Sequence, residues 1–511
     1  MRALSVVADT VADMARIAVI GAGAGAMAAA ARLAVAGHRV VVREREATYG
    51  GALGRFEREG FGFDTGPALL HLPAVYRDLF LKTGREPLES ALTLTQVDPA
   101  SRHVFPDGAA VSLPNASRGG VLAALDGALG AGAGERWSDV LGRARDAWDA
   151  TRRPLLEEPL WADWQVLGRD PYPAVRRRGL FGRGRGPTTA TLAEVARREL
   201  ADPRLIALLE SHATAYGFDP RAVPASAAVL PYMEQTFGTW YPAGGMRALA
   251  DAVYARCVER GVEFRFGAPV ERIVVADGRA AGVVTADGEV TEAEHVVAGV
   301  TPQALAGLVP GGAPWEASDA PAGPPPGPVP ARMTVALALR GARPDGTAHR
   351  TVVHTDDRAA ELAAVFGGGA PAAPTVTVLR PDDPATRPDD AHEAVTLTAT
   401  VAAPGPGGLA ADAVEALAER MTERAGAAVP ELRERLLWRE ALPPSGEALL
   451  PGPALAGGGG RFLRPANRTR IPGLYAVGGW SHPGGGPAHA GMSGAIVAGL
   501  IVNGDDWHGS T

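Results

Sequence analysis

A chain of 511 residues is longer than one compact hydrophobic core usually supports, so we expect two closely joined domains. Its formal charge of −7 at pH 7 lacks the basic excess typical of nucleic-acid-binding proteins, so we expect no nucleic-acid partner. One cysteine, Cys257, excludes an intramolecular disulfide and is typical of a reducing cytoplasm. Residues 1–13 have no sustained apolar run, and we expect them to be a disordered leader.

The first elements of the chain predict a dinucleotide-binding turn. The segment Arg16–Ile20 is typical of a short buried strand, and Ala26–Ala36 of a helix rich in small residues. The turn between them has glycine or alanine at Gly21, Gly23, Gly25 and Ala26. Such glycines allow a tight turn and a close approach of the backbone to a pyrophosphate, and a small residue in the helix lets it pack on the strand.

A second strand at Arg39–Arg43 ends in an acidic residue, Glu44, which lies 23 residues beyond Gly21. A carboxylate at this distance accepts hydrogen bonds from ribose hydroxyls. The order of strand, turn, helix, strand and acid therefore predicts dinucleotide binding, but it does not separate FAD from NAD.

Residues 45–67 decide between the two cofactors, because they resemble the FAD-containing amine oxidase and phytoene desaturase group. The matching residues are Gly50, Gly51, Phe61, Phe63, Asp64, Gly66 and Pro67. In that group the glycine pair passes under the cofactor phosphates and the following strand leads towards the flavin, so the resemblance implies FAD. The arginine that usually follows the glycine pair is Ala52 here, and Arg55 is the candidate to supply the lost charge.

The C-terminal segment resembles the flavin motif of phytoene desaturases and retinol saturases, including the run His482–Gly486. Glycines at Gly478 and Gly479 let the backbone pass the ribityl chain. We expect a small-residue helix to begin near Met492, so that Gly491, Met492 and Ser493 direct amides at the pyrimidine side of the flavin. In the middle of the chain, the family resemblance implies that the backbone of Val270 binds the adenine edge.

The resemblance implies an α/β fold, in which a Rossmann-like FAD-binding domain of the amine-oxidase type carries an inserted substrate domain. We assign residues 14–71, 237–304 and 456–504 to the first domain, and residues 72–236 and 305–455 to the second. The first insertion is predicted to be largely helical. The second has the alternating patterns of a mixed sheet over the flavin, at Met333–Leu339, Thr351–His354, Pro374–Leu379 and Ala394–Val401.

The basic, glycine-rich segment Arg176–Arg185 allows two interpretations. It is either a solvated loop or a peripheral anchor on anionic lipid, suited to an enzyme that draws its substrate from a bilayer. We expect a cytoplasmic protein, with peripheral membrane contact as the alternative.

The candidate catalytic residues are His482, His489 and Trp480, which flank or belong to the His-Pro-Gly-Gly-Gly run. Either histidine could move a proton beside the flavin, and His482 could equally hold the loop through a structural hydrogen bond. His489 and Trp480 depart from the commonest carotenoid-desaturase pattern, which has small or apolar residues there. We expect no metal site, because the chain has no CxxC pair, no HExxH motif and no dense carboxylate cluster.

The resemblance implies an oxidoreductase that moves a hydride between flavin N5 and a lipophilic polyene, as in desaturation of a carotenoid precursor. Oxygen or a quinone would then accept the electrons. The alternative is reductive cyclisation of a polyene polyketide, such as a polycyclic tetramate macrolactam, with NADPH as donor, and the polar residues around the loop favour it. A more distant alternative is a non-catalytic protein that binds flavin or pigment.

Overall fold

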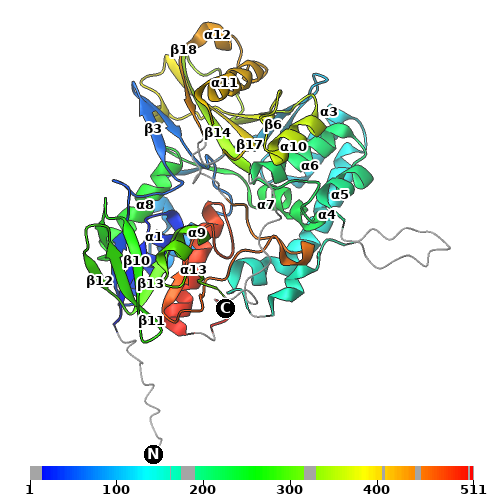
Figure 1. Cartoon of the computed structure of the whole chain (residues 1–511). Helices are drawn as coiled ribbons and strands as arrows, with labels where there is room; N and C mark the ends of the chain where they lie inside the picture. Colours follow the sequence, from blue (N-terminus) through cyan, green and yellow to red (C-terminus); the bar gives the residue numbers. More distant parts are fainter. Residues whose placement is uncertain are drawn as a thin grey trace, which may run out of the picture.

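The computed structural model describes residues 14–161, 163–173, 190–315, 330–404, 409–443, 451–504 and 507–509. The expected leader at 1–13 and the basic segment Arg176–Arg185 lie outside these residues. One lobe contains the first helix, α1 (Ala24–Val35), beside the last long helix, α13 (Pro487–Asn503), and the other lobe is built on the strands β14 and β17 (Figure 1).

The first lobe is built on a parallel sheet of five strands in the order β19-β13-β1-β2-β9. These strands are β1 (Arg16–Ile20), β2 (Arg39–Arg43), β9 (Glu263–Arg265), β13 (His295–Ala298) and β19 (Leu474–Ala476). On β1, Ile17 and Val19 pack against helices α1, α8 (Met246–Glu259) and α13. Ala18 and Ile20 point to the opposite face. That face is covered by the antiparallel sheet of β10 (Val270–Ala276), β11 (Arg279–Thr285) and β12 (Val290–Glu292) and by α9 (Pro302–Leu308).

Helices α1 and α13 approach each other closely because glycines replace side chains where they meet. A Cβ on Gly494 would lie 2.5 Å from the Gly25 carbonyl oxygen and 2.8 Å from the Ala29 nitrogen. A Cβ on Gly25 would lie 2.7 Å from the Gly478 Cα. Because all of these obstacles are backbone atoms, no rotamer change relieves the clash. The helices from the two ends of the sequence therefore pack with their backbones in direct contact.

The second lobe is built on a sheet of seven strands in the order β18-β14-β17-β16-β15-β6-β7. Its strands are β6 (Ser101–Val104), β7 (Ala110–Leu113), β14 (Pro330–Arg340), β15 (Arg350–Val353), β16 (Val376–Leu379), β17 (His392–Ala402) and β18 (Leu436–Leu442). One face packs against α11 (Ala411–Ala425) through Met333, Val335 and Leu337. The other face looks towards the first lobe, and α10 (Arg358–Gly367) and α12 (Leu432–Arg435) lie at the sheet's margins.

Helices from the first insertion close one side of the second lobe (Figure 1). They are α3 (Arg118–Leu129), α4 (Ala133–Arg152), α5 (Leu192–Glu199), α6 (Pro203–Ala215) and α7 (Val229–Phe237), with short helical turns at Arg153–Glu157, Trp164–Gly168 and Ala225–Ala228. Thr191 and Glu194 form a reciprocal capping box that starts α5. Trp137 and the leucines of α6 lie in the shared core.

The first insertion is largely helical, as predicted, and the exception is residues 94–113. These residues form strands, including β6 and β7, and β6 pairs in parallel with β15 of the second insertion. The helix α2 (Ala74–Gly84) departs from the proposed division at residue 72, because Tyr76, Leu79 and Phe80 lie in the core of the first lobe. We therefore propose to place α2 with the cofactor domain.

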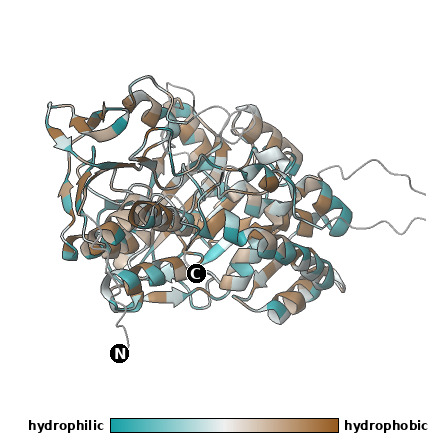
Figure 2. Ribbon diagram, turned by 90° about the horizontal axis from the view of Figure 1, so that it is seen from below, coloured by the Kyte–Doolittle hydropathy of each residue, from teal (hydrophilic) through white to brown (hydrophobic). Residues whose placement is uncertain are grey.

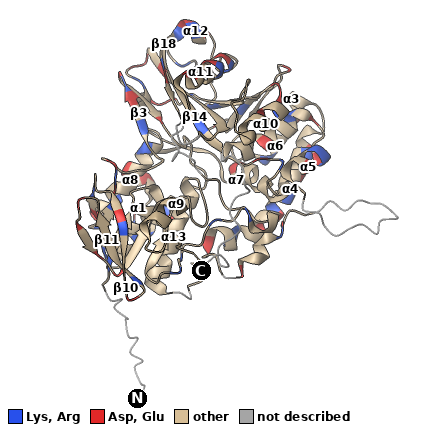
Figure 3. Ribbon diagram, viewed as in Figure 1, with Lys and Arg blue, Asp and Glu red and all other residues tan. Residues whose placement is uncertain are grey.

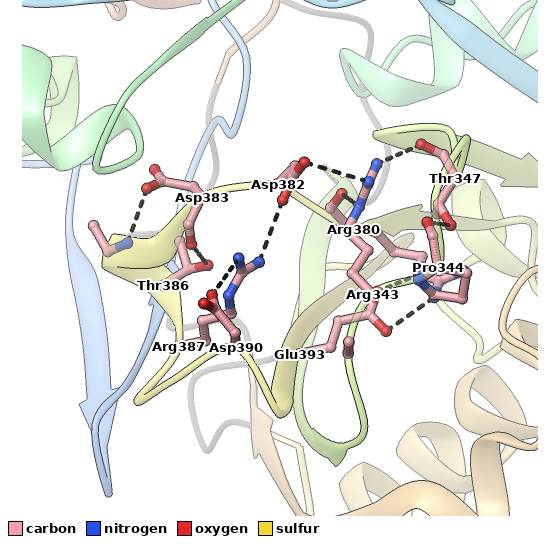
Figure 4. Close-up of polar contacts among 12 residues, drawn as sticks. Arg343, Pro344, Thr347, Arg380, Asp382, Asp383, Thr386, Arg387, Asp390 and Glu393 are labelled. Atoms are coloured by element: carbon pink, nitrogen blue, oxygen red, sulfur yellow. Dashed lines mark hydrogen bonds and ion pairs between the residues drawn. The ribbon is translucent and has the colours of Figure 1, made fainter.

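A hairpin, a two-stranded sheet and a loop join the lobes. The hairpin of β3 (Arg55–Arg58) and β4 (Phe61–Asp64) packs on Ala336 and Ala338 of the large sheet. The two-stranded antiparallel sheet pairs β5 (Leu94–Gln96) with β8 (Trp240–Pro242), which lie far apart in the sequence. In the loop between β16 and β17, shown in Figure 4, the Asp383 carboxylate accepts hydrogen bonds from the Tyr241 hydroxyl (2.9 Å) and the Gly244 amide (2.6 Å).

The loop itself is fixed by a buried ion pair. Arg380 donates to Glu393 at 2.6 and 2.9 Å, and both side chains are almost fully buried. Arg343 and Arg387 both lie within ion-pair distance of Asp382 at the outer end of the loop, at 3.9 and 3.4 Å (Figure 4). Because a buried charge must be paired, this network fixes the loop in one position and, with it, Asp383.

Acidic and basic residues are interspersed over the outer elements (Figure 3). Hydrophilic residues are concentrated on outward-facing helices, and hydrophobic residues occur throughout the ribbon (Figure 2). This distribution is typical of a chain whose helices each bury one face.

The contact between α1 and α13 gives a first prediction. Gly494→Ala should destabilise the protein by about 1–3 kcal/mol, because overpacking against backbone forces the two helices apart. Gly142→Ala on α4 is the matched control, since a Cβ there meets nothing within 4 Å and alanine favours a helix. Urea unfolding of both variants measures the difference, and equal midpoints would contradict the close contact.

Candidate functional site

The turn between β1 and α1 has the shape of a phosphate cradle. Gly21 has a φ of +89°, and a Cβ there would lie 3.1 Å from the Gly299 carbonyl oxygen. A Cβ on Gly23 would meet nothing within 4 Å, so the backbone at this position is open. Ala26 must be small, because its Cβ lies 3.2 Å from the Cβ position of Gly299. Gly23 directly precedes α1, so its open backbone lies at the N-terminal end of that helix, where free amides attract an anion.

Glu44 lies at the end of β2 beside this turn, as predicted. Its carboxylate is buried and accepts hydrogen bonds from the amides of Ala22 (2.6 Å) and Glu46 (2.9 Å). The amide of Ala268 donates to the Glu44 carbonyl at 2.9 Å, which places the start of β10 and its first residue, Val270, near Glu44. The predicted ribose and adenine contacts therefore lie in one region.

The second glycine pair lies against the first turn. The amide of Gly50 donates to the Ala22 carbonyl at 2.9 Å, and a Cβ on Gly51 would lie 3.1 Å from the Gly23 Cα. Gly66 has no room for a side chain, because its Cβ would lie 1.9 Å from the Ala52 carbonyl oxygen. The structure thus brings the predicted phosphate-contacting glycines together.

Arg55, the candidate replacement for the missing arginine, has partners of its own. It donates to the carbonyls of Gly244 (2.8 Å) and Ala385 (2.5 Å). A cation that the sequence analysis missed, Arg247, lies nearer the glycine pair: its Nη1 is 3.4 Å from the Cβ position of Gly50 and donates to the Tyr49 carbonyl at 2.8 Å. The sequence feature that could have identified Arg247 is its position as the second residue of α8, directly after Gly244, Gly245 and Met246.

The C-terminal glycines also face open space. Gly478 has a φ of +96°, a Cβ there would meet nothing within 4 Å, and its amide donates to the Ser493 hydroxyl at 2.9 Å. Buried Asn467 donates to the same hydroxyl at 3.0 Å and to the His482 carbonyl at 2.8 Å. Asn467 was not predicted from the sequence. It holds the loop that contains the His-Pro-Gly-Gly-Gly run, next to Gly479.

The expectation that the last helix begins near Met492 is wrong. The helix α13 begins at Pro487, because proline is favoured in the first turn and Gly486 precedes it in a conformation that favours glycine. Gly491 lies one turn inside the helix, where a Cβ would lie 2.9 Å from Val75 Cγ1, and Met492 packs on the helical core of the second lobe.

The geometry of these segments fits FAD. The backbone is open at Gly23 and at Gly478, and Gly25 makes the close contact with Gly478. Glu44 and Val270 lie beside the turn that contains Gly23. A dinucleotide with its pyrophosphate at Gly23 and its ribityl chain at Gly478 would extend from β10 towards the N-terminal end of α13.

A cavity of about 200 Å³ lies between this end of the cofactor site and the inner face of the large sheet. It is bounded by the loop after β4, by α6, α7 and α10, and by Gly486 and Pro487 at the start of α13. Its lining combines apolar side chains with charged and hydroxyl groups. Because a flavin near Gly66 and Gly486 would face this space, the cavity is the candidate substrate site.

Four titratable side chains meet in the cavity wall. Glu234 forms an ion pair with Arg350, and its Oε2 lies 3.8 Å from His71 Nε2 and 3.9 Å from His212 Nε2. Burial alone would raise the pKa of Glu234, but Arg350 and the two histidines hold it well below its usual value. Burial lowers the pKa of both histidines, so the ion pair is charged and the imidazoles are neutral at neutral pH.

The three predicted catalytic residues lie in different surroundings. His482 is fully buried, and its Nε2 hydrogen-bonds the Glu158 carbonyl at 2.9 Å. His489 lines two small cavities, one of which also contacts His71 and Glu234. Trp480 is half-buried and does not line the substrate cavity. Their catalytic roles stay predictions.

Comparison with known proteins assigns the family. Residues 27–502 match the family described as flavin containing amine oxidoreductase. The chain belongs to this family. Hydroxyneurosporene desaturase of Cereibacter sphaeroides is 30% identical over 95% of this chain and 97% of the relative. The zeta-carotene-forming phytoene desaturase of Myxococcus xanthus is 34% identical over 55% of this chain and 52% of the relative.

Among solved structures, putrescine oxidase with bound putrescine has a TM-score of 0.63 at 15% identity, and the match covers 96% of this chain and 99% of that chain. At that identity the likeness shows the fold alone. The predicted phytoene-desaturase-like group, the amine-oxidase-type fold and the FAD cofactor are confirmed. As a member of this family, the protein is an FAD-dependent oxidoreductase.

Two further findings concern the part of the chain that the structure describes. Within it, no group of three or more His, Cys, Asp or Glu residues could hold a metal ion. Within the same ranges, no helix is long and apolar enough to cross a bilayer. The predicted lipid contact through Arg176–Arg185 stays a prediction.

Asp64, from the strand that leads towards the flavin, caps α8. Its carboxylate accepts hydrogen bonds from the amides of Met246 (3.0 Å) and Arg247 (3.4 Å). Burial raises the pKa of Asp64 from 3.8 to about 6, and these hydrogen bonds oppose the shift only in part. The unfolded carboxyl therefore ionises at lower pH than the folded one.

This shift predicts a pH dependence. Between about pH 4 and pH 6 the folded chain keeps a proton that the unfolded chain has lost, so the stability of the wild type should fall relative to Asp64→Asn as pH rises. Above about pH 6 the difference should stay constant. Denaturant unfolding of both proteins at each pH measures it, and a gap that is flat from pH 4 to 6, or that widens in favour of the wild type, would contradict the raised pKa.

Proposed function

We propose that this protein oxidises a lipophilic polyene by desaturation, as its relatives named hydroxyneurosporene and phytoene desaturase do. The observation that carries the proposal is the cavity between the start of α13 and the large sheet, which would place a substrate against the flavin. FAD, held by the glycine turns, would supply a hydride acceptor; the substrate would lose a hydride from one carbon and a proton from its neighbour as the double bond forms.

The chain's residues supply position and a route for the proton. Because burial lowers the pKa of His489 to about 4, its ring is neutral at neutral pH and able to accept a proton. It shares a small cavity with His71, a second neutral imidazole that can pass the proton onward. We propose that His489 accepts the proton and that His482 holds the loop through the Glu158 carbonyl.

A second candidate is reductive cyclisation of a polyene that carries polar groups, such as a macrolactam polyketide, with NADPH as donor. The titratable groups in the cavity wall, Glu234, Arg350 and two histidines, support it, since they offer partners for the polar groups of such a substrate. The two candidates differ in the direction of electron flow, since desaturation reduces FAD and needs oxygen or a quinone to reoxidise it. A protein that only bound flavin or pigment would do neither.

Anaerobic bleaching of the flavin decides between these candidates. We expect the FAD-loaded protein to lose its flavin colour on mixing with phytoene or hydroxyneurosporene in detergent micelles, and to form a product with a longer chromophore. Absorbance spectra and chromatography follow the two changes together. No bleaching with either carotenoid, together with turnover of a macrolactam polyene by NADPH, would replace the desaturase proposal by the cyclase. Dithionite bleaching alone would indicate a non-catalytic protein.

The role of His489 has its own test. His489→Ala should slow substrate-dependent flavin reduction by about 100-fold or more, since general-base catalysis typically contributes that much. FAD binding should be unchanged. His482→Ala is the comparison, and it should lower the unfolding temperature more than it changes the rate. Stopped-flow absorbance gives the rates, and an unaltered rate in His489→Ala would remove this residue from the mechanism.

A further inference from the structure

An arginine without a carboxylate partner lies in the wall of the substrate cavity. Arg332, near the start of β14, pairs across the sheet with Thr400, and both line the cavity. Within the described residues its one hydrogen-bond partner is the Ala215 carbonyl, at 3.3 Å, and it forms no ion pair. Burial lowers the pKa of its guanidinium, but arginine keeps its charge in proteins. Arg332 is half-buried, and a cation that lines a cavity without a carboxylate partner attracts an anion.

A second donor lies beside it. Tyr216, which follows α6, lines the same cavity, and its hydroxyl has no hydrogen-bond partner among the residues that the structure describes. Burial and then Glu234 raise the pKa of Tyr216 to about 12, so the hydroxyl keeps its proton at neutral pH. The two side chains lie near enough to interact electrostatically. Together they offer several N–H donors and one O–H donor to the same space.

The carboxylates in the cavity wall do not neutralise Arg332. Glu234 is paired with Arg350. Glu361 lies 3.2 Å from Arg358 and accepts a hydrogen bond from the Thr375 hydroxyl at 2.9 Å. Each acid thus has partners of its own, and Arg332 is left as an unneutralised positive charge.

This donor pair lies near the flavin end of the cavity. The ring of Tyr216 is 3.9 Å from the Cβ position of Gly486, the residue that precedes α13. The threonines Thr398 and Thr400 extend the polar wall along the sheet. A bound oxyanion would therefore be anchored close to the reacting part of the substrate.

We propose that the substrate carries a planar oxyanion, a carboxylate or an enolate, which binds the Arg332 guanidinium and the Tyr216 hydroxyl. The guanidinium matches such a group because its N–H donors form a planar fork. The inference rests on the proposed function, and it narrows the substrate from a polyene to a polyene with an acidic group.

A purely structural role for Arg332 would give a different result. The Ala215 carbonyl is at the C-terminal end of α6, where a cation stabilises the helix dipole. Loss of that contact would lower the stability of the fold. It would not change the preference of the protein for an acid over the matching alcohol.

All-trans retinoic acid and all-trans retinol test the inference, because they share one polyene skeleton and differ in the charged group. We expect the FAD-loaded wild-type chain to bind the acid at least about tenfold more tightly, as charge-assisted hydrogen bonds allow. Arg332→Met should bring the two affinities together with little change for retinol. Arg332→Lys should keep part of the preference, and Tyr216→Phe should lose several-fold of it. Quenching of tryptophan fluorescence measures the affinities.

Arg340→Met is the matched control, since Arg340 ends the same strand outside the cavity and is exposed. It should bind both ligands as the wild type does. Three results would overturn the proposal: equal affinities in the wild type, an unchanged preference in Arg332→Met or Tyr216→Phe, or binding of neither ligand. If Arg332→Met fails to fold, Tyr216→Phe decides, because it removes one oxygen from an otherwise identical ring.

The binding measurement needs no turnover, so it can fail independently of the proposed function. A protein that prefers the acid but never reduces its flavin with a polyene would contradict the desaturase proposal and support the oxyanion site. A protein that desaturates a neutral carotene and shows no preference for the acid would support the desaturase proposal and contradict the oxyanion site.

Discussion

The backbone contact between the first and last helices is the constraint on which this structure depends. Gly25 and Gly494 bring α1 against α13, and Gly25 also meets Gly478 after the last strand. Because no side chain separates these segments, the phosphate end and the flavin end of the cofactor site are set by one rigid contact. The two insertions fold outside that contact and can vary without disturbing it. The cofactor half is therefore strongly specified, and the substrate half is free to change.

The substrate half is fixed to this frame by polar groups. Asp383 accepts hydrogen bonds from the segment that precedes α8, and a buried arginine–glutamate pair holds its loop. The cavity has charged and hydroxyl groups among apolar side chains, and such groups need partners when a ligand covers them. The charged and hydroxyl groups of the cavity are the basis for the proposed preference for a polyene with an acidic group.

Local patterns predicted the cofactor domain well and the substrate site poorly. The bounds of β1 and β2 match the expected ones, because each strand is an apolar run between charged residues or glycine. The start of α13 was missed, since Gly486 and Pro487 have the composition of a loop. The cluster around Glu234 was missed because its members come from separate segments and only folding brings them together. Arg332 did have a local signal, a cation within an otherwise apolar strand.

A crystal structure with bound FAD and retinoic acid would test the central claim most directly, that one continuous site runs from the glycine turns to the substrate cavity. We predict pyrophosphate density at Gly23, the isoalloxazine ring beside Gly486, and the carboxylate within hydrogen-bond distance of Arg332 and Tyr216. Flavin density away from Gly486, or the acid bound outside the cavity with its carboxylate in solvent, would contradict the account.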